Sequence, residues 1–146
     1  MASTPQFAAT PIVAIGNLAA VTACTTRAPT ATASLAGANI VALTNTSASG
    51  LRIDSIEVTA ASNAISAATT AGLVQIWAWD GTNAYLIDEI AVSAVTPSAT
   101  VAAFQTIKYY TNPIVLPAAY KLYCSTTVTT TASTNALSVV ANGGAY

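Results

Sequence analysis

The sequence contains no histidine and very little charge, and these two absences remove most catalytic chemistry. Histidine is the commonest general base and the commonest ligand of transition metals. Charged residues make up 6% of the chain, against about a quarter in typical soluble domains. The two cysteines lie far apart in the sequence and give no zinc-binding pattern. The composition therefore predicts a protein that is not an enzyme and that has no cofactor and no metal site.

Basic residues are also scarce, which excludes nucleic acid as a partner because phosphate binding needs several cations on one surface. The four basic residues do not cluster: Arg27, Arg52, Lys108 and Lys121. No basic residue precedes Arg27, so a secretory signal is not expected. The apolar segment 7–24 contains Pro11, Gly16 and Asn17, and we expect no membrane span there. In a reducing cytosol, Cys24 and Cys124 are expected to be buried free thiols, and they can pair only if the fold juxtaposes them.

Small uncharged residues dominate what is present. Hydrophobic residues reach 53%, much of it alanine, and threonine is the other abundant residue. Such a chain is too hydrophobic and too weakly charged to be disordered. Its net charge of −1 gives little repulsion between copies. The composition predicts a folded protein that is packed against other proteins.

The stretch Gly72–Val92 predicts a central β-hairpin. Two runs rich in β-forming residues flank Asp80-Gly81, which supplies the positive φ that a tight turn needs. In the first arm, Trp77 and Trp79 project from one face, and Val74, Ile76 and Ala78 project from the other. Because both faces are apolar, we expect this arm to be covered on both sides.

Further short strands are expected at about the spacing of a β-sandwich. In the strand 51–60, Leu51 and Ile53 are out of phase with Ile56 and Val58, which predicts a bulge near Asp54-Ser55, with a strand buried on both faces as the competing interpretation. The segment 11–26 is either two strands broken at Gly16-Asn17 or one strand followed by an extended arm. The other expected strands are 39–46, 100–111 (ended by Asn112-Pro113), two within 114–125 around a turn at Pro117, and 136–141 (ended by Asn142-Gly143-Gly144).

The predicted fold is an all-β antiparallel sandwich or jelly roll of about 7–9 strands. An extended N-terminal arm over residues 1–30 precedes the sandwich domain over residues 31–146, and this arm is a candidate inter-subunit strand.

The acidic residues give no catalytic pair by themselves. Asp88 and Glu89 are adjacent on a strand, so they point to opposite faces. Asp54 or Glu57 can meet one of them across strands, which would give the carboxylate pair that glycosidases use. Ordinary cross-strand salt bridges with Arg52 or Lys108 are the favoured interpretation.

The aromatic side chains are the remaining candidates for a site. They can form a sugar-stacking platform, but core and intersubunit contacts are the favoured role because aromatic residues dominate both. The candidate subunit-interface residues are Trp77, Trp79, Tyr109 and Tyr110.

Several motifs together resemble a group of small virion structural proteins of tailed bacteriophages. They are GLRIDSI (50–56), QIWAWDG (75–81), DEIAV (88–92), VTPSAT (95–100), LPAAYKL (116–122) and VVANGGAY (139–146), and they span roughly two thirds of the chain. Members of the group more often have Gly at the place of Ala119 and an acidic residue at the place of Ala145. These departures indicate that the two turns are set differently in this chain.

The resemblance implies a non-enzymatic subunit of a phage particle. A capsid decoration, or cement, protein on the capsid surface is the role that it favours, and such proteins are small, rich in β-structure and often trimeric. The implied partners are the major capsid protein and other copies of the chain, with synthesis in the host cytoplasm. The alternatives are a neck or tail subunit, and a carbohydrate-binding module of a host-recognition appendage that would use Trp77 and Trp79.

Overall fold

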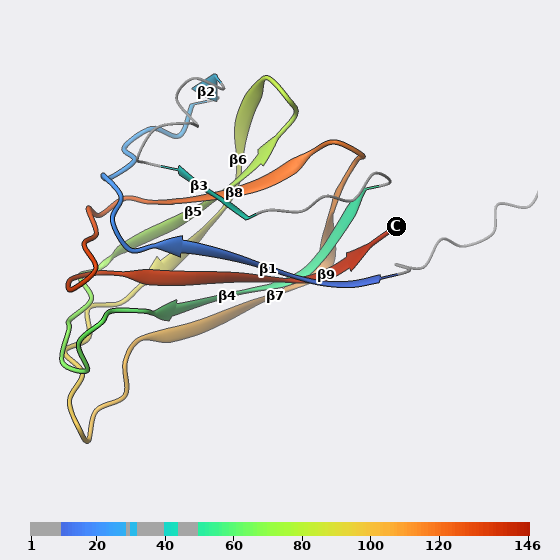
Figure 1. Cartoon of the computed structure of the whole chain (residues 1–146). Helices are drawn as coiled ribbons and strands as arrows, with labels where there is room; N and C mark the ends of the chain where they lie inside the picture. Colours follow the sequence, from blue (N-terminus) through green and yellow to red (C-terminus); the bar gives the residue numbers. More distant parts are fainter. Residues whose placement is uncertain (1–9, 29, 32–39, 44–49) are drawn as a thin grey trace, which may run out of the picture.

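The chain folds into two antiparallel β-sheets that pack face to face (Figure 1). The structure is a computed structural model that describes residues 10–28, 30–31, 40–43 and 50–146. Its strands are β1 (Thr10–Leu18), β2 (Thr30–Ala31), β3 (Ile40–Leu43), β4 (Leu51–Ala60), β5 (Gly72–Trp79), β6 (Asn83–Val92), β7 (Gln105–Leu116), β8 (Lys121–Thr126) and β9 (Leu137–Ala145). The four-stranded sheet has the order β1-β9-β4-β7, and the five-stranded sheet has the order β2-β6-β5-β8-β3. The described part of the chain contains no helix, which confirms the predicted all-β sandwich class.

The main hydrophobic core lies between the two sheets and is built from the inward side chains of both. Alternate residues of a strand point to the same face, so each strand contributes every second side chain. The buried set includes Leu51, Ile53, Ile56, Val58, Val139 and Ala141 from the four-stranded sheet, and Val74, Ile76, Leu122 and Cys124 from the five-stranded sheet. Burial of this apolar area is the dominant favourable term in the folding of the chain.

A β-bulge in β4 puts four apolar residues on one face. The register of β4 shifts between Ile53 and Ser55 against both of its neighbours, β7 and β9. The shift brings Ile56 and Val58 back into phase with Ile53, and all three are at most 1% exposed. The bulge predicted near Asp54-Ser55 is therefore confirmed.

Strand β7 continues through Asn112-Pro113, so the predicted end of the strand at this dipeptide is wrong. Ile114 pairs with Ile53 and Tyr109 pairs with Ser55, which leaves residues 110–113 as an irregular segment within β7. Proline has no N–H to donate to a ladder and is tolerated at such bulges and on edge strands. β7 is an edge strand, and for both reasons Pro113 does not terminate it.

Strand β9 also runs beyond its predicted end at Asn142-Gly143-Gly144. It continues to Ala145 and pairs with β1 on one side and with β4 on the other. A Cβ atom on Gly143 would lie 1.8 Å from the carbonyl oxygen of Arg52. Glycine therefore allows the backbones of β9 and β4 to approach closely at the bulge, where any larger residue would clash.

Strand β1 is an edge strand of the four-stranded sheet. It pairs with β9 along its whole length, from Thr10 with Ala145 to Leu18 with Leu137, and it passes through Gly16-Asn17 without a break. Of the two interpretations of this segment, one strand followed by an extended stretch fits the structure. Within the arm predicted over residues 1–30, residues 10–18 thus belong to the sandwich sheet, while residues 1–9 and 29 lie outside the described residues.

Candidate contact surface

The β5–β6 hairpin has the turn that its sequence predicts. Gly81 has a φ of +104°, and the Asp80 carboxylate accepts hydrogen bonds from the backbone N–H groups of Thr82 (2.8 Å) and Asn83 (2.7 Å). These backbone hydrogen bonds, with that of Asn83 the strongest, lower the pKa of Asp80. Asp80 therefore has a structural role in the turn.

The outer side of β5 is covered by the chain itself. Trp77 is fully buried, and its indole Nε1 donates to Ser125 Oγ at 2.9 Å. Ser125 Oγ in turn donates to Gln75 Oε1 at 3.0 Å, and Gln75 Nε2 donates to the backbone carbonyl of Thr26 at 3.1 Å. Cys24 packs in the same cluster as Trp77. The second sheet thus covers one face of β5 and the segment 21–28 covers the other, which confirms the predicted coverage on both sides. The sequence did not predict that the segment 21–28 covers this face, because the residues of the segment show no periodicity that indicates what they pack against.

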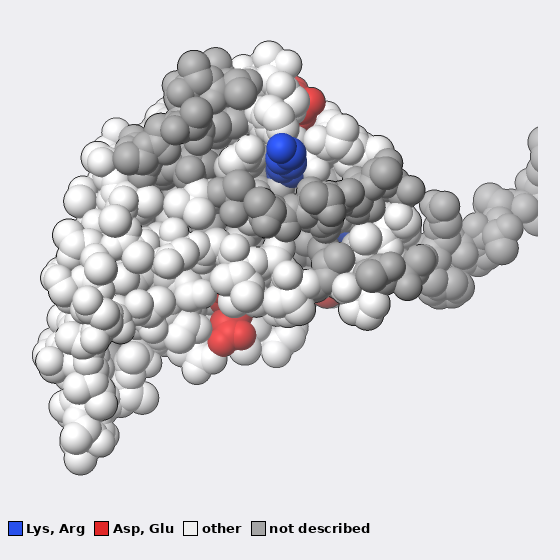
Figure 2. Space-filling model, viewed as in Figure 1, with Lys and Arg blue, Asp and Glu red and all other residues white. Residues whose placement is uncertain are grey.

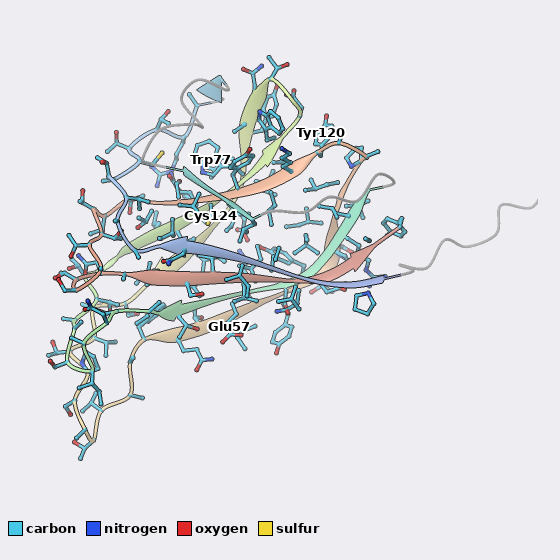
Figure 3. The ribbon with its side chains drawn as sticks, in the orientation of Figure 1. Glu57, Trp77, Tyr120 and Cys124 are labelled. Atoms are coloured by element: carbon cyan, nitrogen blue, oxygen red, sulfur yellow. The ribbon has the colours of Figure 1, made fainter. Side chains whose placement is uncertain are left out.

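This arrangement removes Trp77 from any external contact. None of the surface of its side chain, which is labelled in Figure 3, is exposed. Trp79 is half-buried. Its ring is nearly perpendicular to that of Tyr123, with the ring centroids 5.9 Å apart, and the Lys121 ammonium lies 4.9 Å from the centroid of the Trp79 ring. A sugar-stacking platform needs exposed ring faces, and Trp77 has none to offer.

The two tyrosines among the candidate interface residues lie differently. Tyr110 is half-buried, and its hydroxyl donates to Asp88 Oδ2 at 2.6 Å. Tyr109 is 75% exposed. Of the four residues proposed from the sequence, Tyr109 offers the largest free surface to a partner, and the subunit interface itself stays a prediction.

Asp88 and Asp54 pair with the two cations named from the sequence, but neither pair is the expected bridge between neighbouring strands. Lys108 and Asp88 lie on opposite sheets, and Arg52 and Asp54 lie on the same strand. Asp88 Oδ1 lies 2.6 Å from Lys108 Nζ, and Arg52 Nε lies 2.8 Å from Asp54 Oδ1. Burial alone would raise the pKa of Asp88, but the hydrogen bonds from Lys108 and Tyr110 outweigh it and the pKa is lowered. Asp88 therefore stays ionised at neutral pH and joins β6 of one sheet to β7 of the other.

Glu89, next to Asp88 in the sequence, faces the opposite side of its sheet. Its Oε1 accepts hydrogen bonds from Arg27 Nε at 2.8 Å and from Gln75 Nε2 at 3.3 Å. The prediction that Asp88 and Glu89 point to opposite faces is confirmed, so these two neighbours cannot act as a catalytic dyad.

Both cysteines are free and buried, as expected, and they lie on opposite faces of the five-stranded sheet. Cys124 is part of the main core, and burial raises its pKa to about 12. Such a thiol is a structural residue and not a nucleophile.

Among the described residues, no group of three or more His, Cys, Asp or Glu side chains is placed to hold a metal ion. The same part of the chain has no helix that is long and apolar enough to cross a membrane.

Exposed apolar side chains gather on the outer side of the four-stranded sheet, which we call the outer sheet face. Nine large hydrophobic side chains are exposed among the described residues, and five of them belong to the two outer strands of this sheet. They are Val13 (64%), Ile15 (63%), Ile107 (42%), Tyr109 (75%) and Val115 (61%). The strand register places them on one side. Ile15 pairs with Val140, Val140 pairs with Glu57, and Glu57 pairs with Ile107. Figure 3 shows Glu57 on the side of this sheet that faces away from Trp77 and Cys124.

The few charges on the outer sheet face are bound within the face. Arg52 and Asp54 form a mutual ion pair, and Glu57 Oε1 accepts hydrogen bonds from the side chains of Gln105 and Thr59. These partners reduce the desolvation cost of covering the charged groups. The face combines large apolar side chains with charges that are paired or hydrogen-bonded, which makes it a candidate contact surface.

A second apolar region lies at one end of the sandwich, where the loops 61–71 and 93–104 meet; we call it the loop end. The stretches 58–79 and 90–107 contain no charged residue, and Figure 2 shows this end without charge in that view. A hollow of about 300 Å³ lies there, lined by Ile65, Pro97, Val101 and small residues around them. Ile65 is 80% exposed, and Val101 is 49% exposed. Seven of the nine exposed large hydrophobic side chains of the described residues therefore lie in these two regions, and the other two, Tyr85 and Ile87, lie on β6.

Comparisons with protein-family models, with curated proteins and with solved structures find no match for this chain.

Proposed function

We propose that this protein is a non-enzymatic structural subunit of a bacteriophage particle, and that it acts as a decoration protein on the capsid surface. Its partners in this role are the major capsid protein and other copies of the chain. The protein stabilises the head lattice through protein–protein contacts, without a cofactor and without chemistry of its own.

The observation that supports this proposal is the outer sheet face. A domain with five large apolar side chains exposed on one sheet face would be prone to non-specific association in free solution. The same face is suited to permanent burial, because its Arg52–Asp54 ion pair and the hydrogen bonds of Glu57 are already formed within the chain. The resemblance of the sequence motifs to phage virion proteins is the reason that we propose a phage particle.

The experiment is to add the purified protein to expanded capsids of the phage that encodes it, and to measure co-sedimentation and the melting temperature of the capsid shell. We expect stoichiometric binding and a higher melting temperature than for the capsid alone, because a ligand that binds only the folded lattice stabilises it. No binding at micromolar concentration would contradict the proposal.

Copy number per particle separates the head from the other positions. Hundreds of copies per virion, counted by quantitative mass spectrometry, support a place on the capsid lattice. A dozen or fewer copies point instead to the neck or tail, where the same packing surface would serve in a smaller ring.

A further inference from the structure

The outer sheet face has a distribution of charge that suits one particular arrangement of two copies. Its apolar side chains stand on the outer strands β1 and β7, and its charged residues stand on β4, next to the centre. The other central strand, β9, presents no charge to this face. Its outward residues are Ser138, Val140 and Asn142, whose side chains are apolar or carry neutral hydrogen-bonding groups.

We propose that the outer sheet face packs against the same face of a second copy, around a two-fold axis parallel to the strands. Such an axis reverses the strand order, so β1 of one copy lies over β7 of the other, and β9 lies over β4. Two sheets stacked in this way pack about 10 Å apart with their strands nearly aligned. The arrangement is closed and uses one patch twice, as homodimer interfaces do.

The register of the sheet then brings apolar residues together across the interface. Val13, Asn142, Ser55 and Tyr109 form one row across the four strands. Reversal of the strand order places Val13 opposite Tyr109 of the second copy. The next row in the same way places Ile15 opposite Ile107 of the second copy.

The same reversal keeps the charges of the two copies apart. Glu57 lies opposite Val140 of the second copy, and the neutral groups of Ser138 and Asn142 lie nearby. If β4 instead lay over β4, with the axis crossing the strands at the row of Glu57, the Glu57 carboxylates of the two copies would face each other, and two carboxylates buried together are costly. Charge therefore favours the β1-over-β7 arrangement among the ways in which two identical faces can meet.

The size of the outer sheet face is compatible with this pairing. Four strands spaced about 4.8 Å apart, each about seven residues long within the face, give an area of roughly 450 Å² in flat projection. The protruding side chains add to that area. The total buried area would lie near the lower end of the standard range of about 1,200–2,000 Å². The pairing does not depend on the proposed function, because it involves copies of this chain alone.

The test is sedimentation equilibrium of the purified protein, without capsids, at concentrations up to about 100 µM. We expect a monomer–dimer equilibrium for the natural sequence. Val13→Glu and Tyr109→Lys should each weaken the dimer by about tenfold or more, because each buries a charge opposite an apolar or aromatic residue. Both side chains are largely exposed, so neither change should disturb the fold, which circular dichroism will verify.

The double variant Val13→Glu/Tyr109→Lys makes the test specific for the register. Within one copy the two positions are three strand spacings apart, about 14 Å, and cannot form an ion pair. Across the proposed interface they meet twice, so the double variant should recover dimerisation relative to either single variant. Ile65→Glu places the same charge on the exposed loop end and is the matched control, with no expected effect on the dimer.

Four results would overturn the inference. They are a natural protein that stays monomeric at the highest concentration, a trimer in place of a dimer, a double variant that is as weak as the sum of the single variants, and an equal loss of dimer in the Ile65→Glu control. If capsid binding is observed while the dimer is absent, the proposed function stands and this inference fails.

Discussion

Asp88 on β6 of one sheet contacts Lys108 and Tyr110 on β7 of the other sheet and so joins the two sheets. Asp88→Ala tests how much this contact contributes to the stability of the fold. The Asp88 side chain is 15% exposed, and its two oxygens lie 2.6 Å from Lys108 Nζ and 2.6 Å from the Tyr110 hydroxyl. Alanine at this position removes both contacts and leaves the half-buried Tyr110 hydroxyl without its acceptor. The variant therefore measures the polar link between the sheets.

The expected cost follows from the exposure of each partner. Lys108 is 43% exposed, so solvent screening limits its ion pair to about 0–1 kcal/mol. The hydrogen bond from Tyr110 is to a charged acceptor in a half-buried place, and such bonds contribute about 1.5–3 kcal/mol. We expect Asp88→Ala to lower the free energy of unfolding by about 2 kcal/mol, measured by urea denaturation at pH 7 with tryptophan fluorescence as the probe.

Glu89→Ala is the matched control because it removes the neighbouring carboxylate from the opposite face of the same strand. Its ion-pair partner Arg27 is 61% exposed. Gln75 Nε2 keeps its hydrogen bond to the carbonyl of Thr26 when Glu89 is lost. The expected cost is therefore at most about 0.5 kcal/mol. If Glu89→Ala destabilises the protein as much as Asp88→Ala, the reasoning from burial and partners is refuted.

The pH dependence of the same comparison has a definite sign. The pKa of Asp88 is lowered in the folded protein from its ordinary value of 3.8. The unfolded chain therefore takes up this proton first as the pH falls, so the contribution of Asp88 is complete above pH 3.8 and is lost as the pH falls through the folded-state pKa. The stability difference between the natural protein and Asp88→Ala should be constant from neutral pH to about pH 5 and should shrink in more acidic solution. A difference that grows on acidification would contradict this assignment.

Three further predictions concern single positions. Ala119 has a φ of +68°, and Ala119→Gly should raise the free energy of unfolding by up to about 1 kcal/mol because glycine adopts this conformation without strain; an unchanged or lower melting temperature would contradict it. Gly143→Ala should cost several kcal/mol or prevent folding, because its Cβ would lie 1.8 Å from the carbonyl oxygen of Arg52; expression and circular dichroism will show the loss, and a variant of natural stability would refute the close approach. Cys24 and Cys124 are buried and should not react with Ellman's reagent in the native protein, whereas both should react in guanidinium chloride; rapid native reaction of either thiol would show that its cover opens.

The parts of the fold that the sequence predicts well are those that local physics determines. The apolar pattern changes phase between Ile53 and Ile56, which favoured a bulge over a strand buried on both faces, and the structure has the bulge. The Asp80-Gly81 turn is specified by the φ angles that its residues tolerate. Both faces of β5 carry apolar side chains. Each face therefore has to pack against another part of the protein, because neither carries enough polar groups to be exposed to water.

The strand ends were harder to predict because tertiary contacts decide them. Pro113 and Gly143 are strand-breaking residues by local preference, yet both lie within strands whose neighbours tolerate them. The edge position and bulge of β7 accommodate the missing N–H of Pro113, and the close approach of β4 requires Gly143. Neither circumstance is visible until the strand order is known.

The candidate contact surface could be predicted only in part for the same reason. Trp77 was proposed as an interface residue from its size and type, but the segment 21–28 covers it from a distance of about fifty residues in the sequence. Val13 and Ile15 were not singled out, because their exposure depends on which face of β1 meets the core. The odd positions of β1 and the even positions are both largely apolar, so alternation gave no signal there.

The position of β9 between β1 and β4 has a consequence for the order in which the protein can fold during its synthesis. Thr10 pairs with Ala145, so β1 leaves the ribosome long before β9, its neighbour among the described strands of the sheet. β4 likewise has one open side until β9 emerges, although β7 can already pair with its other side. Unpaired strand edges of nascent chains can pair with each other, and non-local pairing is intrinsically slow. The yield of folded protein should therefore fall as the concentration of unfinished chains in the cell rises.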